Sequence, residues 1–172
     1  MAGTEFSGIQ HALANMFHGA HYILTPNKQS RPEHVELMER LAVHIGCANI
    51  VKTTPENHDA IIAYTSQMMH VIAVAVCDDP SLFQYQGFRG CTRVAALDVP
   101  LWTQLFTMNS KALGSALEEL EGNIRTYRQA IEAGDTTTLV EKLSYSAARK
   151  RKMNRLELES GAVGREGKKP KV

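Results

Sequence analysis

The sequence predicts a mainly α-helical chain in which a helical region follows a small strand–helix–strand unit. Apolar residues recur at spacings of three and four through most of residues 54–148, which is the period of an amphipathic helix. Residues 1–53 instead contain two short β-prone runs with one amphipathic segment between them. This unit has the pattern of the edge of an α/β sheet and is too small to be a complete one. Residues 149–172 are a basic tail that we expect to be flexible.

The amino-terminal unit divides into short elements. Residues 1–8 are expected to form a loop, and residues 9–17 are expected to form two turns of helix. Residues 21–25 and 48–52 are β-prone, which predicts two short strands. Residues 30–45 begin with a Ser-x-x-Glu capping box and then follow the helical period, so they predict a helix between the two strands.

The first helix of the helical region is expected to be central. Thr54 can accept a hydrogen bond as its N-cap, and Pro55 suits the first helical position. The following residues, up to position 76, are apolar almost all round the helix. A helix without a polar face predicts burial on all sides.

The remaining elements are a loop and two further helices. Residues 81–92 contain two glycines and predict a loop, with the next helical segment starting at Thr92. Asp98 then caps a long helix whose apolar stripe runs over residues 101–131. A helix of that length rarely finds enough apolar partner surface within a small monomer, so we expect dimerisation through the helical region. Residues 136–148 predict a final amphipathic helix.

Composition argues against several kinds of partner and site. The formal net charge of +1 gives no electrostatic reason to expect nucleic acid or an anionic membrane as the main partner. The longest uninterrupted apolar run, residues 71–77, is too short to cross a bilayer, and no signal sequence follows Met1. Three cysteines without Cys-x-x-Cys pairing indicate reduced thiols in a cytoplasmic protein. No carboxylates stand at ligand spacing from His18 and His21, so no metal site is expected.

Three side chains are candidates for chemistry, each with a structural alternative. His70 lies on the apolar helix, where it is either a satisfied core residue or part of a site. Arg93, beside a glycine-containing segment and a helix start, can grip a carboxylate bidentately or form a surface ion pair. Trp102 belongs to the core or to an interface. No G-x-G-x-x-G turn is present, so the residues supply no dinucleotide fingerprint and no complete catalytic set.

Six segments of the chain match, in order and spacing, the pattern of one known enzyme family. The segments are MAGTEFSG at 1–8, YILTP at 22–26, PENHD at 55–59, SQMMH at 66–70, GFRGCTRVAALD at 87–98 and LWTQLF at 101–106. The glycine–phenylalanine stretch that leads into Thr-Arg-Val-Ala is the most specific of the six. From Met1 to about Leu143 the chain resembles the carboxy-terminal part of the prephenate and arogenate dehydrogenases of tyrosine biosynthesis.

The resemblance implies a fold and a reaction. In this family a Rossmann-type domain holds NAD or NADP, and a helical domain dimerises and completes the prephenate pocket. The reaction is the oxidative decarboxylation of prephenate to 4-hydroxyphenylpyruvate. Residues 1–53 would then be the last piece of the nucleotide-binding domain, and residues 54–148 the helical substrate-pocket and dimerisation domain. Prephenate and arogenate, and NAD and NADP, all remain open at this stage.

The resemblance also assigns residues to the substrate pocket. Arg93 matches the arginine that pairs with a substrate carboxylate, and His70 matches a histidine that lines the pocket. Thr4 and Glu5 match a loop beside the active site. Ser66 and Trp102 match residues near the pocket or in its supporting shell.

Three departures from the family pattern bear on activity. The family's catalytic histidine stands in a His-Pro pair just upstream of the stretch that begins here at Met1, so no catalytic residue is expected in this chain. Gln67 occupies a position often filled by histidine, and Gly90 replaces a common acidic residue.

We therefore expect the chain alone to bind no dinucleotide and to catalyse no hydride transfer. Three origins stay open, namely a cloned domain, a truncated gene and one half of a split enzyme. In the last case a separate nucleotide-binding polypeptide would be its partner. The alternative function is a non-catalytic helical module that dimerises or senses an aromatic acid.

Overall fold

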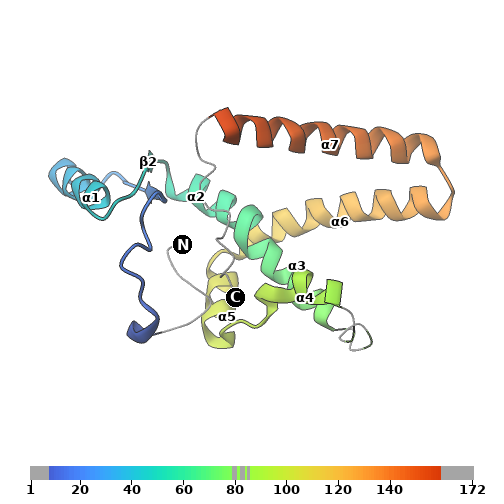
Figure 1. The fold of residues 1–172 in the computed structure, drawn as a ribbon, viewed down its shortest axis with the longest axis horizontal. Coiled ribbons are helices and arrows are strands. Elements are labelled where there is room, and N and C mark those ends of the chain that lie inside the picture. Colours follow the sequence, from blue (N-terminus) through green and yellow to red (C-terminus); the bar gives the residue numbers. More distant parts are fainter. Residues whose placement is uncertain (1–7, 79–80, 82–83, 85, 160–172) are drawn as a thin grey trace, which may run out of the picture. The chain divides into compact units, whose positions relative to one another are not determined.

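The computed structural model describes residues 8–78, 81, 84 and 86–159 (Figure 1). The chain divides into two compact units, residues 1–117 and residues 118–172. The described residues are mainly helical, with a small parallel sheet near the amino terminus, so the predicted fold class is confirmed.

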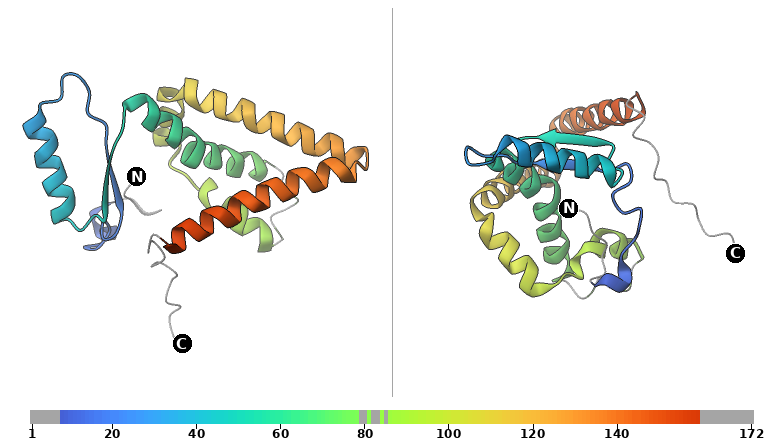
Figure 2. Two further views of the ribbon diagram at one scale, coloured as in Figure 1. Left: turned by 90° about the horizontal axis from the view of Figure 1, so that it is seen from above. Right: turned by 90° about the vertical axis from the view of Figure 1, so that its left-hand side faces the viewer.

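The small sheet consists of β1 (His21–Leu24) and β2 (Asn49–Lys52), which pair in parallel with His21 opposite Asn49. Helix α1 (Pro32–His44) connects them, as Figure 2 shows, and its Ala42 is fully buried. Lys52 on β2 forms an ion pair with Glu39 on α1. Both predicted strands and the helix between them are confirmed.

The predicted capping box of α1 is wrong. The N-cap residue is Arg31, and no side chain caps the helix. The hydroxyl of Ser30 instead accepts a hydrogen bond from the backbone N–H of Asn27 at 3.0 Å and donates one to Asn27 Oδ1 at 3.2 Å. The serine therefore closes the turn before the helix, a local bond that competes with capping.

The predicted helix over residues 9–17 is also wrong. Only η1 (Ile9–His11) forms, as a single 3₁₀ turn. The side chains of Ile9 and Leu13 are exposed, so no apolar packing supports a longer helix here.

The central helix is continuous and contains a wider turn. Helix α2 (Pro55–Ile62) leads through η2 (Ala63–Gln67), a π-helical turn, into α3 (Met68–Cys77). The Thr54 hydroxyl accepts the backbone N–H of Asn57 at 3.2 Å, which confirms the predicted cap.

The central helix is buried along one face only, so the prediction of burial on all sides is wrong. Its buried residues are Ala63, Gln67, Met68 and Ala73. Large apolar side chains on other faces remain accessible, including Ile61, Tyr64, Met69, Val74 and Val76. An apolar face of this kind normally packs against a further surface.

By length and composition alone, the helix Pro55–Cys77 could also cross a membrane. The uninterrupted apolar run of residues 71–77, which alone is too short to cross a bilayer, forms the end of this longer helix. The core helix of a soluble protein meets the same criterion.

The glycine-containing segment is helical, which corrects the predicted loop. Helix α4 (Gln86–Thr92) includes Gly90 and leads into η4 (Arg93–Ala95), a 3₁₀ turn. Both α4 and η4 pack against α3. This tertiary packing outweighs the helix propensity that each glycine loses, about 1 kcal/mol relative to alanine.

The predicted long helix is two helices. Helix α5 (Val99–Met108) begins at Asp98, whose Oδ1 accepts the backbone N–H of Leu101 at 2.9 Å. Asn109 has φ −108° and ψ 25°, which are outside the helical range, and α6 (Ser110–Glu132) starts after it. The break is fixed by the side chain of Asn109, which bonds to the central helix as described below.

The second unit contains the end of α6 and all of α7 (Thr136–Glu159). Gly134, with φ +64°, and Asp135 form the turn between the two helices. The final helix was expected to end at residue 148, but it continues to Glu159, so residues 149–159 of the basic segment are helical. All three cysteines of the chain are free thiols.

Candidate functional site

An aromatic stack joins two helices of the first unit. The imidazole of His70 on α3 and the indole of Trp102 on α5 have their centroids 3.7 Å apart and their planes 27° apart. Phe106, one turn along α5, tilts against Trp102 at 5.4 Å. Trp102 is 8% exposed, while His70 is half-buried. The arrangement presents a rigid aromatic surface of the kind that packs against a planar ring.

A backbone carbonyl fixes the orientation of His70. Its Nδ1 lies 2.9 Å from the carbonyl oxygen of Ser66, one turn earlier in the same helix. A carbonyl can only accept a hydrogen bond, so Nδ1 carries the proton. In the neutral ring, Nε2 is then the nitrogen that can accept a proton or a hydrogen bond from a ligand.

A polar network next to the stack links the central helix to the break at Asn109. The side-chain amide of Gln67 donates to the carbonyl of Leu105 at 3.1 Å. The Asn109 amide donates to Gln67 Oε1 at 2.7 Å and to the carbonyl of Asp59 at 2.9 Å. Gln67 is 5% exposed and is the one buried polar side chain among the described residues. Its polar atoms are therefore satisfied within the protein.

The sequence did not identify this network. In the sequence, Gln67 is only a departure from the family pattern, and Asn109 stands within an apolar period that predicts one continuous helix. A glutamine in an otherwise apolar helix face is a signal that could have been used, because a buried amide requires hydrogen-bond partners.

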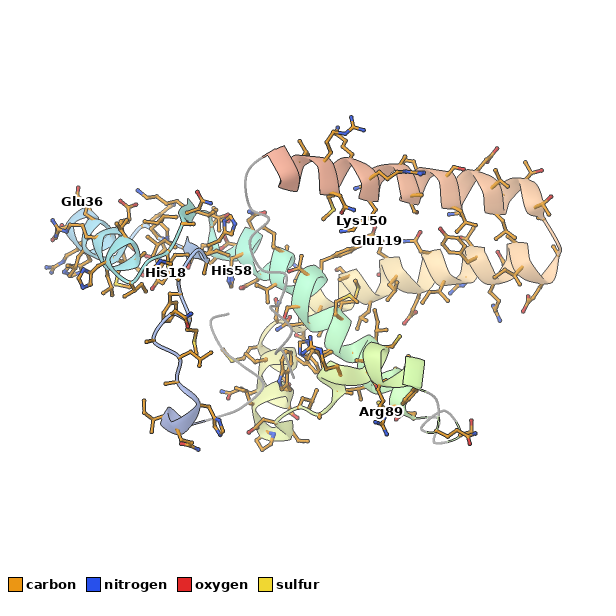
Figure 3. The ribbon with its side chains drawn as sticks, viewed as in Figure 1. His18, Glu36, His58, Arg89, Glu119 and Lys150 are labelled. Atoms are coloured by element: carbon orange, nitrogen blue, oxygen red, sulfur yellow. The ribbon has the colours of Figure 1, made fainter. Side chains whose placement is uncertain are left out.

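The two arginines lie on the elements that cover α3. Arg93 begins η4, which packs against the helix that carries His70, and its side chain is exposed. Arg89 is also exposed and projects from α4 (Figure 3).

The predicted pocket residues are thus brought together in part. The backbone carbonyl of Ser66 bonds to His70, and His70 stacks on Trp102. The backbone of Arg93 lies in a turn packed on α3. Thr4 and Glu5 lie outside the described residues. Within the described part of the chain, no three or more His, Cys, Asp or Glu side chains form a group that could hold a metal ion.

Comparison with known proteins gives two family patterns. The pattern described as "Prephenate dehydrogenase, nucleotide-binding domain" matches residues 1–51. The pattern described as "Prephenate dehydrogenase, dimerization domain" matches residues 54–145. The two matches meet where the strand–helix–strand unit gives way to the helical region.

Individual relatives agree with these patterns. The chain is 27% identical to the prephenate dehydrogenase of Bacillus subtilis over 81% of its own length and 40% of that protein. It is 29% identical to the cyclohexadienyl dehydrogenase of Zymomonas mobilis, over 82% of this chain and 52% of that one. The chain thus spans about half the length of these relatives.

Solved structures show the same likeness. The prephenate dehydrogenase of A. aeolicus, in complex with hydroxyphenyl propionate and NAD+, superposes with a TM-score of 0.81 at 29% identity, covering 89% of this chain and 57% of that one. The Synechocystis arogenate dehydrogenase gives a TM-score of 0.73 at 25% identity, covering 88% and 59%. The resemblance predicted from the sequence is therefore confirmed. Because the dimerization-domain pattern alone covers more than half of the 172 residues, the chain belongs to the prephenate dehydrogenase family.

Proposed function

We propose that this chain is the substrate-pocket and dimerisation half of a prephenate dehydrogenase-type oxidoreductase of tyrosine biosynthesis. The reaction is the oxidative decarboxylation of prephenate to 4-hydroxyphenylpyruvate with NAD or NADP, in the cytoplasm. The observation that supports this most is the stack of His70 on Trp102, with Arg93 in a turn packed on the same helix.

The roles of the residues follow from their chemistry. The guanidinium of Arg93 pairs with a substrate carboxylate through two parallel hydrogen bonds. Nε2 of His70 faces a polar group of the substrate, since Nδ1 is already engaged by the Ser66 carbonyl. Trp102 supplies the aromatic surface for the ring. Thr4 and Glu5 are proposed to line the same pocket.

The described residues do not fit a dinucleotide by themselves. A dinucleotide site needs a glycine-rich turn between a strand and the N-terminus of a helix. The connection from β1 to α1, residues 25–31, contains no glycine, and α1 has no side-chain cap. The cofactor core of the proposed enzyme therefore lies outside these residues, and no hydride-transfer step is assigned to them.

The homodimer is part of the proposal. The match to a dimerization domain and the accessible apolar side chains of the central helix both support a second copy as the partner. Burial of these side chains against a second copy would also explain why so apolar a helix is left uncovered in one chain.

Ligand binding to the chain tests the pocket directly. Trp102 is the only tryptophan, so its fluorescence reports hydroxyphenyl propionate, the aromatic acid bound by the A. aeolicus relative. Arg93→Ala should weaken binding roughly tenfold or more, because a charged hydrogen-bond partner is lost. Arg89→Ala is the matched control, since it removes an exposed arginine four residues away, and it should leave the affinity unchanged.

Two results would count against the proposal. Equal binding by Arg93→Ala and the unmodified chain would exclude Arg93 from the pocket. Binding of the aromatic acid without nicotinamide reduction, even after a nucleotide-binding partner is added, would favour the sensing module over the dehydrogenase.

A further inference from the structure

We propose that Gln67 and Asn109 are positioning residues that hold Trp102 against His70 and so set the aromatic surface of the pocket. This inference rests on the proposed function, because the pocket it refines is the substrate pocket proposed above. Neither residue was assigned to the pocket by the sequence.

The geometry of the two contacts supports the proposal. Gln67 lies three residues before His70, and its partner Leu105 lies three residues after Trp102. The hydrogen bond and the ring stack are thus one helical turn apart along each helix. A side-chain bond at that distance restrains both the rotation and the sliding of α5 on the central helix.

Asn109 anchors the other side of Gln67. Its amide bonds to the Asp59 carbonyl, which precedes the π-helical turn, and to Oε1 of Gln67, the last residue of that turn. Gln67 therefore keeps one orientation, with Nε2 directed at Leu105 and Oε1 at Asn109. The same side chain of Asn109 accompanies the break between α5 and α6, so it also limits where α5 ends.

The polar character of the site favours positioning over simple stability. An apolar side chain of similar volume would fill the buried position without the desolvation that a buried amide requires. A network of directional bonds instead selects one register between two helices. The register selected here is the one in which the two rings are stacked.

The experiment compares variants by the signals of Trp102. Gln67→Leu keeps the volume but removes both bonds, and Asn109→Ala removes the bonds of the Asn109 amide. In both variants the near-ultraviolet circular dichroism of Trp102 should decrease, and quenching of its fluorescence by acrylamide should increase. The affinity for hydroxyphenyl propionate should fall about tenfold. The double variant should be no weaker than Gln67→Leu, because the two residues act as one unit.

Two controls separate positioning from general destabilisation. Thr65→Val removes a 2.7 Å bond to the Ile61 carbonyl that stays within the helix, so it should change none of these signals. Leu113→Ala removes a buried side chain from α6 and lowers stability, but below its unfolding transition it should keep the Trp102 spectrum and the affinity.

The outcomes distinguish this proposal from the proposed function. If Gln67→Leu and Asn109→Ala both keep the Trp102 spectrum of the unmodified chain, the positioning role is overturned. If Gln67→Leu fails to fold, Asn109→Ala decides by the same criterion, since its side chain is only half-buried. If the unmodified chain does not bind the aromatic acid, the proposed pocket fails, while the spectra still decide whether the two amides hold the stack.

Discussion

The rings of His70 and Trp102 are stacked face to face at 3.7 Å although the two residues lie on different helices. Nδ1 of the histidine is held by the Ser66 carbonyl, and Phe106 tilts against the indole at 5.4 Å. The pair therefore combines a buried packing role for the indole with an available ring nitrogen on the imidazole.

Separate substitutions should divide these two roles. His70→Phe keeps a stacked ring but removes both nitrogens, and with them the hydrogen bond to the Ser66 carbonyl. The free energy of unfolding should therefore fall by about 1 kcal/mol, the value of one hydrogen bond. Affinity for hydroxyphenyl propionate, measured by Trp102 fluorescence, should fall roughly tenfold. Trp102→Ala should instead lower the free energy of unfolding by about 3–5 kcal/mol, measured by urea titration with circular dichroism. Unchanged affinity in His70→Phe would exclude the imidazole nitrogen from ligand binding.

Gly46 is the position where a side chain should be least tolerated. Its φ of +90° strains any L residue, and an added Cβ would lie 2.8 Å from Nδ1 of His18. Gly46→Ala should therefore destabilise the chain by more than about 1 kcal/mol. Gly114→Ala and Gly122→Ala are the controls, because both glycines are helical with open space at the Cβ, and each change should stabilise by about 0.5–1 kcal/mol. Thermal unfolding measures all three. If Gly46→Ala left the unfolding temperature unchanged, the backbone before β2 would not require a positive φ at this position.

The turn before α7 should respond to acid. Hydrogen bonds from the side chain and then the backbone N–H of Thr138 lower the pKa of the Asp135 carboxyl below its ordinary value of 3.8. Since the folded pKa is the lower one, this contribution to stability is present above the ordinary value and is lost as the pH falls through the folded pKa. The amide proton of Thr138, followed by NMR between about pH 5 and pH 2, should shift with this titration. Asp135→Asn keeps an acceptor but does not titrate, so the chemical shift of its Thr138 amide should not change with pH. Equal changes in both proteins would contradict the hydrogen bond from Thr138 to the Asp135 carboxylate.

The proposed dimer predicts a position-dependent effect of charge. Ile61 on the central helix is 46% exposed in the single chain. Ile61→Lys should weaken the dimer at least about tenfold, because a buried interface then has to desolvate an ammonium group. Ile9→Lys is the control, since Ile9 is 88% exposed and lies in η1, outside the helical region. Sedimentation equilibrium measures both, and an unchanged dimer in Ile61→Lys would place the interface elsewhere.

Local signals were enough to predict several elements. The strand positions, the Thr54 cap with Pro55, and the Asp98 cap all depend on residues within a few positions of each other, and the structure confirms them. The break at Asn109 was missed because the apolar period continues across it. The break accompanies hydrogen bonds from Asn109 to Gln67 and to Asp59, which lie 42 and 50 positions earlier in the chain. No local sequence pattern contains contacts of that separation.

The sequence named candidate residues for the proposed site, but it did not give their arrangement. The resemblance named His70, Ser66 and Trp102, yet it gave no contact between them, because the stack depends on how α5 packs on α3. The segment that carries Gly90 shows the same limit. Its composition is that of a loop, and only packing against α3 makes it helical.

The π-helical turn at Ala63–Gln67 is equivalent to one inserted residue in an otherwise regular helix. Each residue of an α-helix turns the chain by about 100°, so the insertion sets the angle between the side chains before it and those after it. Deleting one residue from this turn would restore an unbroken α-helix and preserve the facing of His70 relative to α2. If the π-helical turn became α-helical with all of its residues retained, His70 would rotate about the helix axis and away from Trp102. A related sequence that is one residue shorter here can therefore keep the same pocket, and the gap in its alignment belongs within residues 63–67.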